Sequence, residues 1–169
     1  MYDLKQIEQI IHGKIPISKE MGISLERYDT TGLVIKAPLQ KNINHKQTAF
    51  GGSLNAVAVL SCWAFLYLLV NQIDETHPQI VIQKSSIRYL HPVATDFEAV
   101  CAWPEAAKIA FFQKMYYRKK KARIELTAKI FTANEPAVIF NGAFVVSKQL
   151  TAQPTPTPLK STGEAYFVI

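Results

Sequence analysis

The residues with the clearest chemical potential form a short polar stretch, Asn44 to Thr48, that is followed by Gly51-Gly52 and an apolar segment over 53–70. No Asp, Glu, Lys or Arg occurs between Lys46 and Asp74, which favours a helix that is buried on most sides. Backbone N–H groups at a helix N-terminus lack intrahelical partners and carry partial positive charge. Glycines there let a ligand approach the backbone. This helix start could therefore stabilise a carbonyl oxygen as it becomes negative, although a tight loop would use the same glycines.

Three side chains near this point could take part in such chemistry. Asn44 could hold a water or a polarised carbonyl, and His45 is the group beside the loop that could carry a proton near neutral pH. Ser61, on the helix, could orient a water. Each has a structural alternative, because Asn44 could cap the loop, His45 could simply be exposed, and Ser61 could bond to the carbonyl four residues earlier.

The expected substrate-binding residues surround the same helix start or carry positive charge. The first group is Phe50, Ser53 and Asn55, and the second is Arg88, Arg118, Lys119, Lys120, Lys121 and Arg123. Arg and Lys suit phosphate groups, whereas a solvated hairpin tip is the alternative explanation for the second group. Nucleic-acid binding would require aromatic residues interleaved with an extended basic surface. Because the charge here is local, we expect no nucleic-acid partner.

The elements that must position these residues follow from hydrophobic periodicity. Leu4, Ile7, Ile10 and Ile11 recur at helical spacing before Gly13, and one more helical turn is expected before Gly22. Extended segments are predicted over 23–28 and 32–38, joined by a turn.

A period-two pattern follows Pro78. It predicts strands over 80–90, 97–103, 110–118, 124–130 and 137–146, with Arg118–Lys121 at the tip of a turn. Five successive strands with short turns would form an antiparallel meander. One face of that sheet needs a cover, and the long apolar helix is the available one. The sequence therefore predicts an α+β fold in which the sheet wraps the helix, rather than a membrane span.

Composition sets further limits. With 169 residues, of which 49% are hydrophobic, the chain can form one domain with a full core. Its two cysteines form no disulfide framework, which favours a reducing, cytoplasmic setting. No Cys/His cluster has zinc-ligand spacing, so we expect neither metal nor cofactor. From Thr151 the chain is rich in Pro and Thr, so we divide it into a domain over 1–149 and an extended arm over 150–169.

Two sequence segments carry a resemblance to a known family. They are Asn42-Ile43-Asn44-His45-Lys46-Gln47-Thr48-Ala49-Phe50-Gly51-Gly52-Ser53-Leu54, and Ile87-Arg88-Tyr89-Leu90-His91-Pro92-Val93 followed by Asp96-Phe97. Over about 2–147 the chain resembles the hotdog fold of acyl-CoA thioesterases and dehydratases, closest to the thioesterase-like domain of the YiiD C-terminal type. The resemblance implies a homodimer, or a higher homo-oligomer, whose sheets join edge to edge, with acyl-thioester sites at the subunit interface.

The sequence departs from the usual thioesterase pattern at two positions. Phe50 stands where a His is usual, and Val59 stands where relatives place an Asp or Glu along the helix. Two hypotheses follow. The chain is either a hydrolase that cleaves acyl-CoA or acyl-carrier-protein thioesters, or a non-catalytic acyl-thioester binding module. The missing acid favours the second, whereas Asn44, His45 and Gly51-Gly52 favour the first, since polar groups beside an apolar helix are costly to keep without use.

Overall fold

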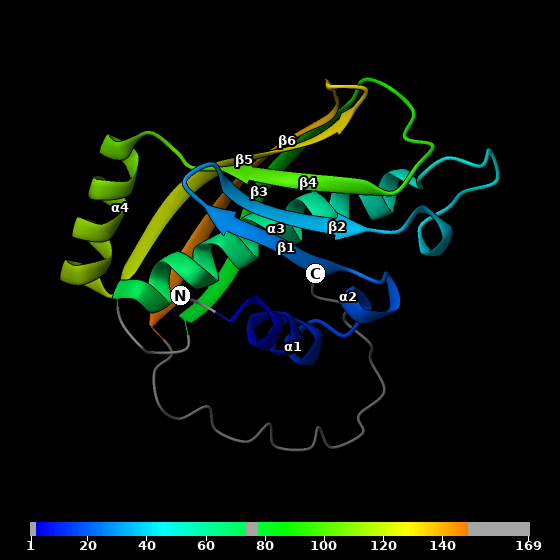
Figure 1. Ribbon diagram of the computed structural model, residues 1–169. Coiled ribbons are helices and arrows are strands. Elements are labelled where there is room, and N and C mark those ends of the chain that lie inside the picture. Colours follow the sequence, from blue (N-terminus) through cyan, green and yellow to red (C-terminus); the bar gives the residue numbers. More distant parts are fainter. Residues whose placement is uncertain (1–2, 74–77, 149–169) are drawn as a thin grey trace, which may run out of the picture.

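The computed structural model describes residues 3–73 and 78–148 and contains one curved antiparallel sheet wrapped around a long helix (Figure 1). In chain order the elements are α1 (Leu4–Lys14), α2 (Ile17–Glu20), β1 (Ser24–Asp29), β2 (Gly32–Ala37), the 3-10 helix η1 (Leu39–Lys41), α3 (Gly51–Ile73), β3 (Pro78–Tyr89), β4 (Phe97–Ala102), α4 (Ala106–Lys119), β5 (Lys121–Thr132) and β6 (Glu135–Lys148). The predicted α+β class is confirmed. The expected arm over 150–169 lies outside the described residues.

The first helix packs along the edge strand β1. Asp3 caps α1 by accepting hydrogen bonds from the amides of Lys5 (2.9 Å) and Gln6 (3.4 Å), as an N-cap carboxylate does. The carboxylate of Glu8 accepts the amide of Leu25 at 2.9 Å, at a point where the β1–β2 register shifts. The Glu8 side chain of α1 therefore satisfies the backbone N–H of Leu25, a donor of the edge strand β1 that faces away from β2.

The order of strands in the sheet is β1-β2-β4-β5-β6-β3, and all neighbours are antiparallel. The expected meander is wrong, because β3 pairs with β6 along its full length and forms the far edge, while β4 lies between β2 and β5. The connection over 90–96 thus carries the chain from one edge of the sheet into its middle. Strand order depends on these non-local pairings, which period-two patterns do not encode.

The strand predicted over 110–118 is also wrong, because this segment belongs to the helix α4. Phe112 and Tyr116 are buried in the core and Ile109 packs against it, so the apolar positions follow helical spacing of three and four. Lys120 ends the helix with a positive φ of 51°, and its amide donates to the carbonyl of Tyr116 at 2.8 Å. The basic run Arg118–Lys121 therefore lies at a helix-to-strand junction and not at a hairpin tip.

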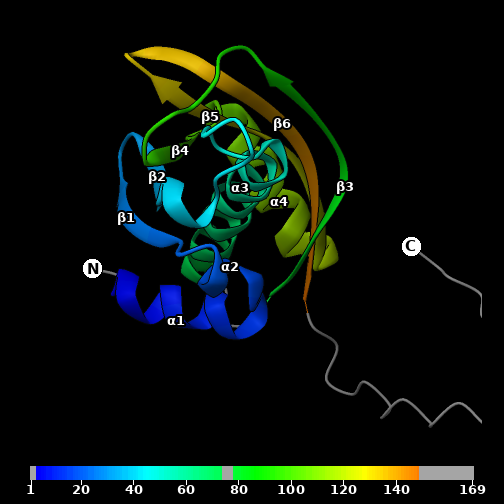
Figure 2. The same ribbon diagram turned by 90° about the vertical axis from the view of Figure 1, so that its right-hand side faces the viewer.

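The helix α3 forms the centre of the core. It is 23 residues long and apolar enough to cross a membrane by length and composition, but 72% of its most apolar window is buried inside the fold. It contacts β2, β3, β4, β5 and β6, and the end-on view in Figure 2 shows the sheet curving around it. Its burial agrees with the expected core helix.

Two cysteines meet in this core. Cys62 on α3 and Cys101 on β4 are both fully buried and both free. A hydrogen bond that the Cys101 thiol donates to Cys62, together with burial, raises the pKa of Cys101 well above its ordinary value. Cys101 therefore stays a neutral thiol, which suits its apolar surroundings.

Candidate functional site

The loop before α3 is organised by the side chain of Asn44. Its Oδ1 accepts the amides of Lys46 (2.8 Å) and Thr48 (3.3 Å). Its Nδ2 donates to Thr48 Oγ1 (3.1 Å) and to the carbonyl of Ala49 (3.4 Å). The amide therefore holds the turn together at both ends, as the loop-capping alternative requires. A catalytic role for Asn44 remains a prediction.

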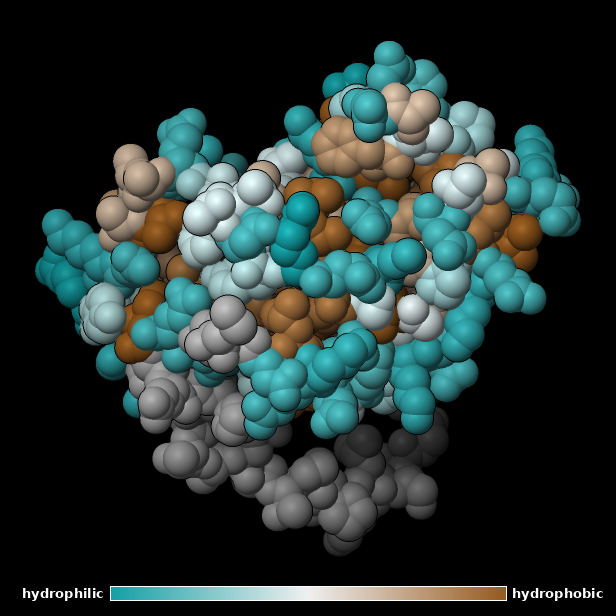
Figure 3. All heavy atoms as spheres, in the orientation of Figure 1, coloured by the Kyte–Doolittle hydropathy of each residue, from teal (hydrophilic) through white to brown (hydrophobic). Residues whose placement is uncertain are grey.

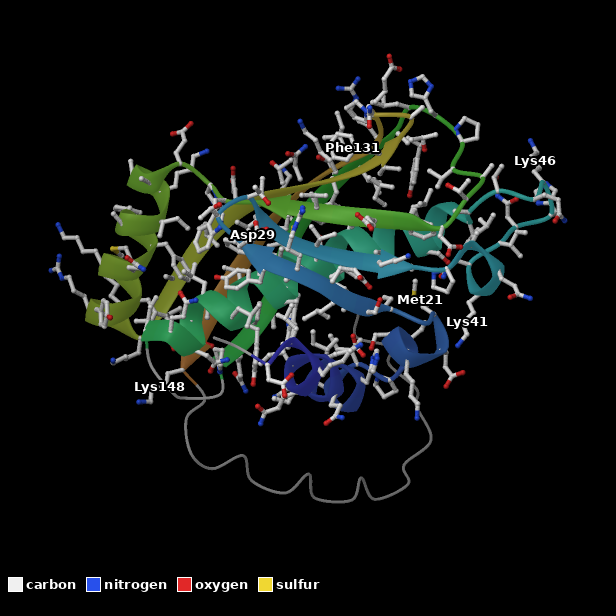
Figure 4. The ribbon with its side chains drawn as sticks, viewed as in Figure 1. Met21, Asp29, Lys41, Lys46, Phe131 and Lys148 are labelled. Carbon is white, nitrogen blue, oxygen red and sulfur yellow. The ribbon has the colours of Figure 1, made fainter. Side chains whose placement is uncertain are left out.

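His45 lies beside Lys46 at the exposed tip of the same loop. Figure 4 places Lys46 at the extremity of the molecule, at the end opposite α4. Gln47 completes the turn with a positive φ of 61°, and its amide donates to the carbonyl of Asn44 at 3.1 Å. His45 is thus presented to solvent.

The start of α3 offers backbone donors at Gly51, Gly52 and Ser53. The Phe50 amide, directly before them, is already bonded to the Asn42 carbonyl at 2.7 Å. Within the described chain, the amides of the three following residues meet no acceptor, because the first intrahelical bond of α3 runs from Leu54 to Phe50 at 3.0 Å. The free donors at this helix start are therefore the amides of Gly51, Gly52 and Ser53.

The exposed ring of Phe50 lies over Gly52. A Cβ atom built at Gly52 would meet the ring of Phe50 at 2.3 Å, whereas one built at Gly51 would stand 3.6 Å from Tyr89. Glycine at 52 therefore lets the aromatic ring cover the first turn of the helix. Phe50 itself is 57% exposed, so the ring forms part of the outer surface at this end.

The end of β3 meets the start of α3. The hydroxyl of Tyr89 donates to the carbonyl of Gly51 at 2.9 Å, and the amide of Ala49 donates to the carbonyl of Val93 at 2.7 Å. An open groove of about 360 Å³ lies at this junction, lined by Thr48, Ala49, Gly51, Leu54, Tyr89, Leu90, His91, Pro92 and Val93. The groove brings the Gly51 end of α3 together with the segment that follows β3.

His91 is the imidazole that sequence reasoning did not single out, and it lines this groove. Its Nε2 stands 4.0 Å from a carboxylate oxygen of Glu135, and both side chains are largely exposed, so this pair adds little to stability. The feature of the sequence that could have identified His91 was its position directly after the predicted strand over 80–90, next to Pro92. Tyr89 and Thr48 were likewise visible in the sequence, but only the structure brings them to Gly51.

The polar side chains along α3 have different environments. Ser53 and Asn55 are half-buried. Ser61 is fully buried, and its hydroxyl donates to the carbonyl of Ala58, three residues earlier, at 2.8 Å. Val59, at the position of the usual acid, is half-buried and packs against the core. The structure therefore leaves Ser53 and Asn55 within reach of solvent and encloses Ser61.

The basic residues do not join the groove within one protomer. Arg118, Lys119, Lys120, Lys121 and Arg123 lie where α4 ends and β5 begins. Figure 1 places α4 at the end of α3 opposite Gly51, and a helix of 23 residues is about 34 Å long. Arg88 is nearer, because it precedes Tyr89 on β3, but successive strand residues point to opposite faces.

No group of three or more His, Cys, Asp or Glu residues in the described part of the chain could hold a metal ion. The polar groups that line the groove are the hydroxyls of Thr48 and Tyr89 and the imidazole of His91, beside the backbone amide of Gly51.

Comparison with known proteins bears directly on this arrangement. Residues 4–148 match the model of the family described as "Putative thioesterase (yiiD_Cterm)". The chain belongs to this family. The match spans the loop at Asn44, the whole of α3 and the groove at Tyr89 and His91, so the family covers every part of the candidate site.

Solved structures support the assignment. A protein of unknown function from Chlorobaculum tepidum is 37% identical, with a TM-score of 0.79 over 86% of this chain and 94% of that one. A putative thioesterase from Shewanella oneidensis is 29% identical, with a TM-score of 0.76 over 85% and 96% of the two chains. A thioesterase from Haemophilus influenzae, at 13% identity and a TM-score of 0.59 over 88% and 92%, shares the fold alone. The yiiD_Cterm chain thus has the hotdog fold.

Proposed function

We propose that this yiiD_Cterm protein hydrolyses acyl thioesters, carried by coenzyme A or an acyl carrier protein, at a site completed by a second subunit. The observation that carries the proposal is the start of α3, where the unbonded amides of Gly51 and Gly52 lie beside a groove that contains Tyr89 and His91. Donors placed in this way stabilise the negative oxygen that forms when a carbonyl is attacked.

The reaction requires water, a proton acceptor and a leaving thiol. The oxygen of water attacks the thioester carbonyl carbon, the carbonyl oxygen gains negative charge against the Gly51 and Gly52 amides, and the carbon–sulfur bond then breaks. The proton that the water loses goes to an imidazole, which returns it to the departing thiolate. His45 and His91 are the candidates, since Val59 supplies no carboxylate. The products are a carboxylic acid and a free thiol.

A second copy of the chain would complete the site along β3. Val81 and Ile82 on this edge strand are 58% and 41% exposed, and the adjoining face of α3 is half-buried at Ala56, Val59 and Trp63. An apolar edge strand is prone to pair with another strand, and a two-fold dimer would satisfy both edges at once. This arrangement would bring groups of the partner against the groove at Tyr89.

The second candidate function is a non-catalytic acyl-thioester binding module. The bonds of Asn44 within its own loop and the enclosure of Ser61 favour it, because both residues serve the fold without a substrate. Binding would then use the same amides and groove, and no thiol would be released.

A panel of acyl-CoA thioesters of different chain lengths, assayed for free thiol release, separates the two functions. Asn44→Ala should lower turnover by about ten- to a thousandfold, with a smaller effect on binding, if the amide acts mainly in the transition state. Each histidine serves as the control for the other. The one whose change to Gln abolishes the acid limb of the pH–rate profile is the proton carrier, because Gln can hold a water but cannot carry its proton.

The outcomes of this panel are distinct. If His45→Gln and His91→Gln both keep the wild-type profile, neither imidazole is the base. If no ester is hydrolysed although CoA esters bind to the wild-type protein, the binding module replaces the enzyme.

Phosphate recognition can be tested separately. Arg88→Gln should weaken the binding of a CoA ester and reduce its salt dependence, since exposed ionic contacts are screened by salt. The double variant Lys119→Gln/Lys120→Gln is the comparison, because it changes the cluster at the other end of α3. If only the double variant weakens binding, the phosphates are bound by that cluster, and within a dimer it would have to come from the partner.

A further inference from the structure

The solvent-facing side of α4 has an unusual composition. Its exposed residues are either apolar (Ala106, Ala107, Ala110, Phe111, Tyr117) or basic (Lys108, Lys114, Arg118, Lys119). Phe111 and Tyr117 are 63% and 56% exposed. No residue of α4 with an acidic or neutral hydrogen-bonding side chain is exposed, apart from the Tyr117 hydroxyl. An ordinary solvated helix face carries charges of both signs, so this face is suited to a different environment.

The positive charge of the chain is concentrated here. Residues 106–124 contain Lys108, Lys114, Arg118, Lys119, Lys120, Lys121 and Arg123 and no Asp or Glu. These seven charges exceed the net charge of +6 for the whole chain, so the remainder is slightly acidic. Glu125 offsets only Arg123, to which it bonds at 2.8 Å. The positive surface is therefore local to α4 and the start of β5.

The shape of this surface favours an extended partner over a small anion. Of its seven basic residues, only Lys108 and Arg123 line the two grooves beside α4. Figure 3 shows hydrophobic and hydrophilic residues intermingled at this end of the molecule, on an outward-facing surface. The other basic residues thus project from an exposed helix rather than into a cavity.

We propose that α4 docks on the surface of an anionic lipid bilayer, with Phe111 and Tyr117 in the headgroup region and the surrounding cations against the negative headgroups. A helix with aromatic and small apolar residues, no exposed acids and flanking Lys and Arg binds in this way. A second copy of the same face would meet like charge. α4 contains no Asn or Ser, and its one Gln, Gln113, is half-buried, so few neutral side chains are available to bond to bases or to a protein backbone.

Within one copy of the chain, this docking surface is separate from the candidate catalytic site. The groove at Gly51 lies at the other end of α3, about 34 Å away along a helix of 23 residues. Docking through α4 therefore leaves the groove of the same copy accessible, and because vesicle binding is measured without a CoA ester, the proposal does not depend on the proposed function.

Vesicle sedimentation tests the proposal with the full chain. Vesicles of phosphatidylcholine with about one-third phosphatidylglycerol should retain the protein at low salt, vesicles of phosphatidylcholine alone should not, and added salt should release it. Lys114→Gln/Arg118→Gln should lower partitioning by about 25-fold, roughly fivefold for each charge removed. Lys14→Gln/Lys19→Gln removes the same charge from exposed positions at α1 and α2 and should keep nearly wild-type partitioning.

A third variant examines the aromatic residues. Phe111→Ala/Tyr117→Ala keeps every charge and should weaken binding at all salt concentrations. Because all these side chains are exposed, thermal melting should show wild-type folding. Failure of the anionic vesicles to retain the wild-type protein, or equal losses for the α4 and the control charge variants, would overturn the proposal. Binding of duplex DNA or of an acidic carrier protein without vesicle retention would also overturn it and assign the surface to that partner.

Discussion

The two edge strands of the sheet have opposite characters. β1 has six residues, its register shifts near Leu25, and Glu8 of α1 occupies the Leu25 amide. β3 has twelve residues, shifts register between Ile82 and Lys84, and exposes Val81, Ile82 and Tyr89 among polar residues. Short edges that a neighbouring element covers resist pairing with other strands, whereas long uncovered edges that expose apolar residues are open to it. The contrast favours β3 over β1 as the edge at which the proposed second copy would pair.

Each edge strand is nevertheless fixed at one end by an aromatic side chain. The indole N–H of Trp103 donates to the carbonyl of Asp29 at the end of β1 at 2.7 Å, and the hydroxyl of Tyr89, at the end of β3, donates to Gly51 at 2.9 Å. Trp103 also packs edge-on against Phe65, with ring centroids 4.8 Å apart. The contact at β1 thus ties the strand to the core, whereas the contact at β3 ties it to the candidate site.

The largest effect is expected from changing the β3 edge. Val81→Asp/Ile82→Asp would place unpaired carboxylates in a subunit interface, which should raise the dimer dissociation constant more than a hundredfold. Sedimentation should then show the 19.0 kDa monomer in place of a species twice as heavy. Arg27→Glu on β1 is the control and should leave the dimer intact. A wild-type protein that sediments only as a monomer at micromolar concentration would contradict the contrast between the edges.

Removing the aromatic contact at β1 should affect stability. Trp103→Ala loses packing against Phe65 and the bond to Asp29, so we expect a loss of about 2–4 kcal/mol in the free energy of unfolding. Urea titration measures this loss. Thioester turnover by the folded fraction should stay within about twofold of wild type. A large fall in turnover per folded molecule would link the β1 edge to the site.

Removing the contact at β3 should affect turnover more than stability, which is the reverse of the effect expected for Trp103→Ala. Tyr89→Phe keeps the ring and loses the hydroxyl bond to Gly51, which costs about 1 kcal/mol or less because the bond is exposed. The turnover rate should fall by a larger factor than this loss of stability alone would cause, because the carbonyl of Gly51 is no longer held in place. If Tyr89→Phe has the wild-type turnover rate, this contact only fixes the end of β3 to α3.

A smaller effect is expected at the glycine pair. Gly52→Ala should displace the ring of Phe50, with which a new Cβ would collide, while Ala favours the helix by up to about 1 kcal/mol. The net change in unfolding free energy should be below about 1 kcal/mol. Phe50→Ala/Gly52→Ala should be more stable than Phe50→Ala alone, since the collision is absent. A destabilised double variant would mean that glycine at 52 serves another purpose.

The smallest effect is expected at the β1 turn. Hydrogen bonds from the Thr31 hydroxyl (2.6 Å) and amide (2.7 Å) lower the pKa of the exposed Asp29 carboxyl. A lowered pKa adds stability above the ordinary range of an Asp and loses it as the pH falls through the folded-state value. Thr31→Ala should therefore raise the pKa of Asp29, as followed by NMR titration. An unchanged titration would exclude the hydroxyl as the main cause.

Much of the fold could be predicted from the sequence. The stop of α1 near Gly13, the helix after Gly51 and the strand with alternating Ile124 and Leu126 all follow local patterns that the structure keeps. The prediction failed at Phe112 and Tyr116, because adjacent aromatic residues favour strands by propensity while their spacing suits a helix. It failed again for the neighbours of β3, because pairing with β6 is a non-local choice.

The candidate site could be predicted only in part. Gly51 and Gly52 were identified because glycines at the start of a helix let a ligand approach its free backbone amides, whichever fold surrounds the helix. Tyr89 and His91 were not, since their place depends on where the end of β3 meets the loop. The roles of Asn44, His45 and Ser61 stay predictions that the proposed assays address.

The enclosure of Cys62 and Cys101 has a practical consequence for those assays. The chain contains only these two cysteines, and both are inaccessible in the folded protein. A colorimetric thiol reagent should therefore report any released carrier thiol without a background from the folded protein. For the same reason, a cysteine introduced on the surface, for example at Lys114, would be the single reactive position for a fluorescent label.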